Sequence, residues 1–356
     1  MKEFGDISGL YVNAAKSLLF PMGTLAAIGP GDLPNLGLTW ELNNVRYLGI
    51  KIAHNEEDSN AFNIGRVVEG LKPTIRFWNT PSLSLMGRVA LAKMVVLPRC
   101  LYVLQGTIYE IPQTYFTTLD KLLTQLLWAG KRVRVGLSTL KRTWEKGGME
   151  VPDLEMYYLA AHLQHAIHWL DEDDNWEKQL IKGTWSLEDL PRVLMMGQKT
   201  PVGTPYIVEH TCRLWERVVK RIIGRAPYAP EMQLWTLQPF IKMATQMTVT
   251  KWIRGGCRTI GDLHTEGGFV TIREAEELFD LGQGQYIQYA RISAIIREIW
   301  PSFPVEPPKS STLNVLHNYA GGKSLISHLY RALRDDRPAP TLRVQQKWET
   351  GVGPSD

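Results

Sequence analysis

Apolar residues recur at helical spacing through most of residues 58–128, and this periodicity restricts that part of the chain to a helical core. Between residues 58 and 78 the apolar positions are Ile64, Val67, Val68, Leu71, Ile75 and Trp78. Between residues 112 and 128 they are Phe116, Leu119, Leu122, Leu123, Leu126 and Leu127. Positions three and four apart share one face of an α-helix. Each segment therefore predicts an amphipathic helix.

The stretch between these two helices, residues 78–105, combines an apolar run with spaced cations. Its apolar positions include Leu85, Val89, Met94 and Val96, and its cations are Arg88, Lys93 and Arg99. Proline disturbs helices, so Pro98 is expected to end the first helix here, and Pro73 to start or kink the preceding one. The pattern fits a helix that holds Arg88 and Lys93 outward for nucleic acid, and it also fits an ordinary surface helix.

Length and composition indicate a globular protein with two or more packed units. The chain has 356 residues, of which 44% are hydrophobic and 21% charged. It contains no run of about 18 apolar residues, so no membrane span is expected. The N-terminal residues have no apolar segment typical of a signal peptide. Cys100, Cys212 and Cys257 are far apart, which favours neither a disulfide framework nor a zinc knuckle. We expect an intracellular protein, in the nucleus or the cytoplasm.

Positive charge is concentrated in one part of the chain. The net charge is only +4, but residues 61–150 hold 13 basic and 5 acidic side chains. Six of these cations fall within residues 131–146, opposed only by Glu145: Lys131, Arg132, Arg134, Lys141, Arg142 and Lys146. A concentrated basic face suits a polyphosphate partner, because neutralised phosphates release condensed counterions. No pattern typical of base recognition is present, so contact with the backbone of RNA or DNA without sequence preference is expected.

The first sixty residues predict two short strands. Residues 8–17 indicate a turn followed by a strand, and residues 46–52 alternate Tyr47, Gly49 and Lys51 with Leu48, Ile50 and Ile52. Two isolated strands are only marginally stable, so this unit is expected to be incomplete.

Several motifs resemble reverse transcriptases of LINE-type non-LTR retrotransposons. Residues 78–102 contain Trp78, Ser84-Leu85-x-Gly87-Arg88, Lys93-Met94, Leu97-Pro98 and Tyr102, an order similar to the thumb of that family. Residues 8–17 are similar to the motif after the catalytic aspartates of the palm, and Tyr47-Leu48-Gly49-Ile50 resembles the primer-grip turn. Residues 147–153 and Tyr157-Tyr158-x-Ala160 resemble the exit from the thumb.

The resemblance implies roles for individual residues. Lys16 would assist departure of pyrophosphate, since an ammonium can neutralise and protonate a leaving phosphate. Tyr47, Leu48 and Gly49 would hold the primer end. Polymerases also need carboxylates that hold two metal ions, such as Mg²⁺. The aromatic-x-Asp-Asp motif of the family should precede Ser8, where Asp6 stands alone. We therefore expect no polymerisation by this chain, and no cofactor or metal of its own.

The rest of the chain offers weaker signals. Residues 154–169 predict one long helix, on which His162, His165 and His168 spread over about 120°, a poor zinc geometry that favours surface histidines. The acidic run 171–174 indicates a solvated helix end. Residues 183–205 indicate a linker, and another helix is expected around Trp215 to Ile223. Residues 321–324 mimic the end of a phosphate-binding loop, but the first glycine of that motif is replaced by His317, and a helix at 325–333 explains them better.

Together these features predict a mainly α protein with a small β-hairpin remnant. We expect the end of a palm at 1–57, a helical thumb with its basic segment at 58–150, a helical region at 151–336 and a frayed tail at 337–356. The expected function is binding of RNA or a primer–template duplex by a non-catalytic reverse transcriptase fragment. The alternative is a helical structural or protein-interaction module derived from a decayed retroelement. No membrane and no small-molecule cofactor are expected.

Overall fold

The structure is a computed structural model in which the chain forms two compact units, Met1–Glu155 and Met156–Asp356. It describes residues 6–33, 37–79, 82–170, 179, 204–218, 234–236, 240, 243, 249–265, 268–299, 311–312, 315 and 324–336. Most of these residues are helical and the strands form small two-stranded sheets, which confirms the expected fold class. The acidic run 171–174, most of the expected linker 183–205, residues 219–223, residues 321–323 and the tail 337–356 lie outside the described residues.

The first unit begins with a set of short elements. These are the 3-10 helices η1 (Ala14–Lys16) and η2 (Gly23–Leu25) and the strands β1 (Leu18–Leu19) and β2 (Thr39–Trp40), which pair in parallel. The strand expected within residues 8–17 was wrong, because this segment ends in η1 and the strand follows it. Ala14 and Ala15 have low strand propensity, which accounts for the turn.

A tight hairpin follows, formed by β3 (Asn44–Tyr47) and β4 (Ile50–Ala53). The prediction of one continuous strand over 46–52 was wrong, because the chain reverses at Leu48 and Gly49, both with positive φ (47° and 84°). Such a pair of residues matches the right-handed twist of the strands that it joins. The turn lies where the resemblance implied one, and its use as a primer grip stays a prediction.

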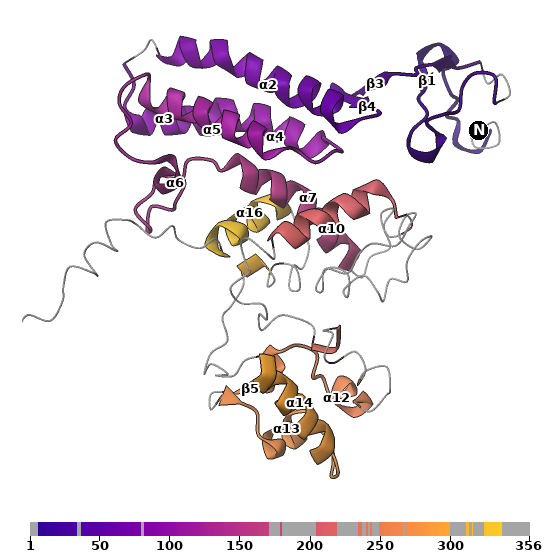
Figure 1. The fold of residues 1–356 in the computed structure, drawn as a ribbon, viewed down its shortest axis with the longest axis vertical. Helices are drawn as coiled ribbons and strands as arrows, with labels where there is room; N and C mark the ends of the chain where they lie inside the picture. Colours follow the sequence, from indigo (N-terminus) through magenta and orange to yellow (C-terminus); the bar gives the residue numbers. More distant parts are fainter. Residues whose placement is uncertain are drawn as a thin grey trace, which may run out of the picture. The chain divides into compact units, whose positions relative to one another are not determined.

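Three helical rods form the body of the first unit (Figure 1). They are α2 (Glu56–Asn79), the continuous run of α3 (Leu85–Leu91), the π-helical turn η3 (Ala92–Val96) and α4 (Leu97–Gly106), and α5 (Gln113–Trp128). Helix α2 packs on α4, α5 and β4, and α3 packs on α5. Most residues expected to face the core are buried on α2 and α5, including Ile64, Leu71, Phe116 and Leu123, whereas Val67 and Trp78 are half-buried. The predicted three-helix bundle is therefore present.

Two prolines lie within helical runs and neither begins nor ends its run. Pro73 lies inside α2, which begins at Glu56, so no helix starts there. Pro98 lies in the first turn of α4, and the helical run continues through it. Pro98 has no backbone N–H to donate within the helix. The π turn directly before it accommodates this missing hydrogen bond, since widened turns occur where the helical hydrogen-bond ladder is interrupted.

The helical run Leu85–Gly106 is long and apolar enough to cross a membrane by length and composition, with a mean hydropathy of 1.4 in its most apolar window. Core helices of soluble proteins meet the same criterion. Here Val89, Ala92, Val96, Cys100 and Leu104 are buried within the bundle.

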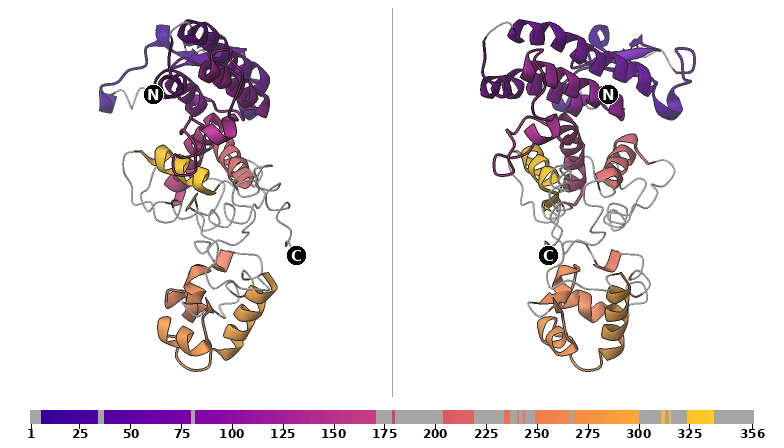
Figure 2. Two further views of the ribbon diagram at one scale, coloured as in Figure 1. Left: turned by 90° about the vertical axis from the view of Figure 1, so that its left-hand side faces the viewer. Right: turned by 60° about the vertical axis from the view of Figure 1, so that its left-hand side comes forward.

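The second unit contains two sets of elements. One consists of α7 (Leu154–Leu170), α10 (Tyr206–Val218) and α16 (Leu325–Asp336), where Tyr157 stacks on Tyr330 with ring centroids 3.8 Å apart. The expected helices at 154–169 and 325–333 are thus confirmed, and α10 covers the described part of the helix expected around Trp215. Figure 2 shows these elements from two further directions.

The other set runs from residue 234 to residue 299. It comprises η5 (Leu234–Thr236), α12 (Thr250–Arg254), η6 (Gly261–Leu263), β5 (His264–Thr265), β6 (Gly268–Phe269), α13 (Ile272–Leu278) and α14 (Tyr286–Ile299). Asp262 accepts hydrogen bonds from the backbone N–H groups of Arg258 and Thr259, and Thr271 and Glu274 cap α13 reciprocally. These local bonds fix the turns between its short elements.

Candidate nucleic-acid interface

The basic segment of residues 131–146 belongs to a compact stretch of turns, residues 129–151, that is closed by backbone hydrogen bonds. We call this stretch the knot, without any topological meaning. Helix α5 ends at Ala129 and Gly130, both with positive φ, and the short helix α6 (Leu137–Leu140) follows. The N–H groups of Met149 and Val151 both donate to the carbonyl of Leu140 at 3.0 Å. Leu140 and Val151 pack with Val89 of α3 and Leu127 of α5. The knot is therefore anchored to the helical bundle.

Four of the predicted cations are exposed on this knot. Lys131, Arg132 and Arg134 lie on the loop between α5 and α6, and Lys146 lies on the turn that follows α6. Among the described residues, no carboxylate lies within 4.0 Å of any of these four side chains. Trp144, which sequence analysis did not single out, is 51% exposed on the same turn. The knot thus presents unpaired cations together with an exposed aromatic ring.

Arg88 does not share this exposure. It is only 6% exposed, and one guanidinium nitrogen donates to Leu126 O and Asn79 Oδ1 (both 3.1 Å) and to Trp78 O (3.4 Å). A guanidinium held in this way ties the ends of α2 and α5 to α3. The sequence predicted that Arg88 faces nucleic acid, but its side chain lies inside the bundle. A phosphate could reach the guanidinium only if the ends of α2 and α5 separated from α3.

Lys141 and Lys93 are engaged with carboxylates. The Lys141 side chain is 12% exposed, and its ammonium lies 2.9 Å from Asp120 of α5 and 3.3 Å from Asp153. Lys93 lies 3.4 Å from Glu150 on the surface. Arg142, the remaining cation of the segment, is half-buried, and its carbonyl accepts the N–H of Glu150. Lys141 and Lys93 link α5, η3 and the knot, so both are less available to an external anion than the loop cations.

The residues to which the resemblance gives roles make no observed contact with the knot. Tyr47 and Leu48 are exposed at the tip of the β3–β4 hairpin beside Gly49, and the Tyr102 hydroxyl donates to the carbonyl of Leu48. Lys16 is exposed in η1, and no hydrogen bond or ion pair of its ammonium is observed within the described ranges. Neither set contacts the loop cations at 131–134 in any interaction observed here.

The histidines of α7 form a cluster that the sequence did not predict. His162 is buried and not on the surface, and its ring lies 4.9 Å from that of His210 on α10. The His210 Nε2 atom lies 3.2 Å from the Tyr158 hydroxyl. Burial, with smaller effects of the charges of His162, Arg213 and His165, lowers the pKa of His210 to about 3. Within the part of the chain that the structure describes, no three His, Cys, Asp or Glu side chains are placed so that they could hold a metal ion.

One further group of cations was missed because it is dispersed in sequence. Arg46 and Lys51 are cross-strand partners in the hairpin, and both lie over the ring of Phe62 on α2. The signal that could have found the pair is the Leu48-Gly49 turn, since residues equally far from a two-residue turn on its two strands face each other.

No known protein family has a profile that matches this chain. The likeness to LINE-type reverse transcriptases therefore rests on the quoted motifs.

Proposed function

We propose that the first unit binds nucleic acid through the phosphate backbone, with Lys131, Arg132, Arg134 and Lys146 as its contacts. The observation that carries the proposal is the exposure of these four cations on an anchored knot. The cations that the sequence placed beside them are held in the bundle or paired with carboxylates.

The chemistry of the knot favours binding without sequence preference. Guanidinium and ammonium groups neutralise phosphates, and each neutralised phosphate releases counterions. The exposed ring of Trp144 can stack on a base whatever its identity, because every base has a π face. The proposed ligand is RNA or a primer–template duplex, as the resemblance to LINE-type reverse transcriptases implies. Binding, and not synthesis, is the activity proposed for this chain.

The test measures affinity for a labelled RNA duplex at several salt concentrations by fluorescence anisotropy. The triple variant Lys131→Gln, Arg132→Gln, Arg134→Gln should bind more weakly. For three lost phosphate contacts, the slope of log K against log salt should become shallower by about 2 to 3.

A matched control removes three exposed cations from the second unit, through Lys251→Gln, Arg254→Gln and Arg258→Gln. Its slope should stay close to that of the wild type. Equal slopes in the two triple variants would mean that net charge alone drives binding, and the knot would lose its assigned role. Tight, salt-insensitive binding to a protein, without binding to RNA, would favour the interaction-module alternative.

A further inference from the structure

An uncompensated group of cations surrounds Phe62, at the start of α2. The Lys51 N–H donates to Asn63 Oδ1 at 2.9 Å, and Asn63 Nδ2 donates to the Lys51 carbonyl at 2.8 Å. The backbone N–H and carbonyl of Lys51 are therefore hydrogen-bonded to α2 and not to Arg46. Arg46 and Lys51 form a non-hydrogen-bonded cross-strand pair, in which the side chains lie closer together. Like charges directly opposite each other destabilise a hairpin.

Nothing described in the structure neutralises these charges. Arg46 Cζ lies 5.0 Å and Lys51 Nζ 5.1 Å from the centroid of the Phe62 ring. Arg66 follows one helical turn after Phe62 and is exposed. Within the described residues no carboxylate lies within 4.0 Å of Arg46, Lys51 or Arg66, and the nearby Glu69 is paired with Lys72 at 2.5 Å. Two cations over one aromatic ring, with a third one helical turn further along α2, form an arrangement that a phosphate group would stabilise.

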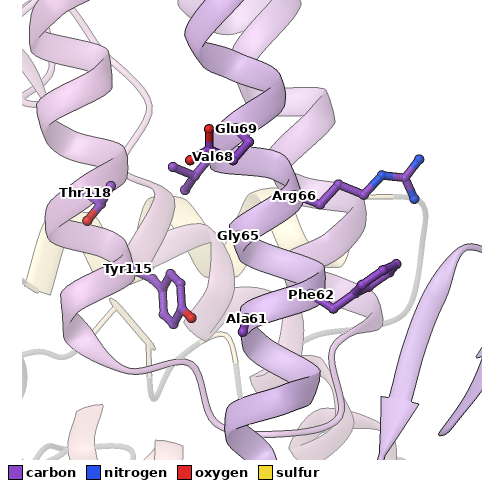
Figure 3. A pocket seen from close by; sticks show the side chains of 8 residues that line it. All are labelled: Ala61, Phe62, Gly65, Arg66, Val68, Glu69, Tyr115 and Thr118. Carbon is purple, nitrogen blue, oxygen red and sulfur yellow. The ribbon is translucent and has the colours of Figure 1, made fainter.

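A groove of about 470 Å³ lies on the neighbouring side of α2 (Figure 3). It is lined by Ala61, Phe62, Gly65, Arg66, Val68 and Glu69 of α2 and by Tyr115 and Thr118 of α5. In Figure 3, Phe62 and Arg66 extend from α2 away from α5, while Tyr115 of α5 lies on the opposite side of α2. A Cβ atom added at Gly65 would meet no atom within 4 Å. Because Gly65 has no side chain, the surface of α2 is open at this position, between the cations around Phe62 and the groove.

From this juxtaposition we propose that α2 carries a nucleotide-binding groove. The phosphates contact Arg46, Lys51 and Arg66, and the sugar and base lie across Gly65 beside Tyr115. A cationic edge next to a partly apolar groove matches the two halves of a nucleotide. The nucleotide can be free or part of a strand, and the site does not depend on the basic knot at 131–146.

The test uses two probes, ADP by isothermal titration calorimetry and a fluorescein-labelled 12-mer of oligouridylate by anisotropy. Gly65→Phe fills the groove, and it should weaken the probe that binds the wild type by about tenfold or more. Gly70→Phe is the matched control, since Gly70 lies on the same helix, also has open space around it, and does not line the groove. Its affinity should remain near that of the wild type.

Arg66→Gln tests the cationic edge and keeps the proposal falsifiable if Gly65→Phe does not fold, as judged by circular dichroism. It should also weaken binding by about tenfold. Loss of ADP binding identifies a free nucleotide, and loss confined to the oligonucleotide identifies a strand. The proposal is overturned if neither probe binds the wild type, or if both groove variants bind as the wild type does. The triple variant at 131–134 should leave ADP binding unchanged. This result distinguishes a failure of the groove proposal from a failure of the proposal that the knot binds nucleic acid.

Discussion

Arg88 illustrates how one residue can serve the fold while it resembles a ligand contact. Its guanidinium satisfies the carbonyls of Trp78 and Leu126 and the amide of Asn79, which lie at the ends of two other helices. A carbonyl that loses a buried donor keeps its desolvation cost without compensation. Arg88 is therefore a structural residue of the helical bundle.

The substitution Arg88→Met should lower the free energy of unfolding of the first unit by about 3 kcal/mol, because the buried acceptors lose their donor. Urea denaturation followed by circular dichroism measures this loss. Arg99→Met is the control, since Arg99 is exposed on the same helical run and donates only to Thr74 in the observed bonds. Similar stabilities of the two variants would contradict the internal role of Arg88.

Glycines in the first unit differ in what a side chain would meet. A Cβ atom at Gly148 would lie 2.1 Å from the carbonyl oxygen of Arg142, so Gly148→Ala must push the knot apart. Gly70 lies in α2 with open space around it, and Gly70→Ala should stabilise the helix by about 0.5 to 1 kcal/mol. Thermal unfolding should therefore shift downward for Gly148→Ala and upward for Gly70→Ala. An unchanged or raised unfolding temperature for Gly148→Ala would show that the knot is not packed as described.

At the scale of elements, the contact of α7 with α10 depends on a buried neutral histidine. The ring of His210 is 1% exposed, and burial is the main cause of its lowered pKa of about 3. An unfolded chain binds a proton to this group near its ordinary pKa of about 6.5. The folded state of the second unit is therefore favoured above that value, and protons favour the unfolded state below it.

Acidification should destabilise the second unit through His210. Between about pH 6.5 and pH 3 the loss reaches at most about 1.4 kcal/mol per pH unit from this one group. His210→Gln should flatten this pH dependence of thermal unfolding, whereas His328→Gln, at an exposed position of α16, should leave it unchanged. An unaltered slope in His210→Gln would mean that other groups govern the acid response.

At the scale of the whole molecule, the chain consists of two compact units. Units with separate cores commonly unfold in separate steps. We expect calorimetry to show two transitions, of which Arg88→Met lowers one and His210→Gln changes the pH dependence of the other. A single transition that both variants shift alike would show that the units unfold as one.

The periodicity of the sequence determined the helices of the first unit and their buried faces. Ile64, Leu71, Phe116 and Leu123 are buried as predicted, because the spacing of apolar residues alone places them on one face. Helix ends were harder to predict at Pro73 and Pro98, since neighbouring helices and a π turn support a helix that local sequence would interrupt. Residues 46–52 were ambiguous because alternation does not distinguish a strand from a tight hairpin.

Only the tertiary structure decided which cations face solvent. In the sequence, Arg88, Lys141 and Arg132 are equally charged and all lie in the basic part of the chain. In the fold, Arg88 meets helix-end carbonyls and Lys141 meets Asp120 and Asp153, whereas Arg132 projects from an exposed loop. The same applies to Arg46, Lys51 and Arg66, which only the hairpin and α2 bring together. The spacing of residues sets which side of one helix they occupy, but contacts with distant segments determine whether a charge is paired or available.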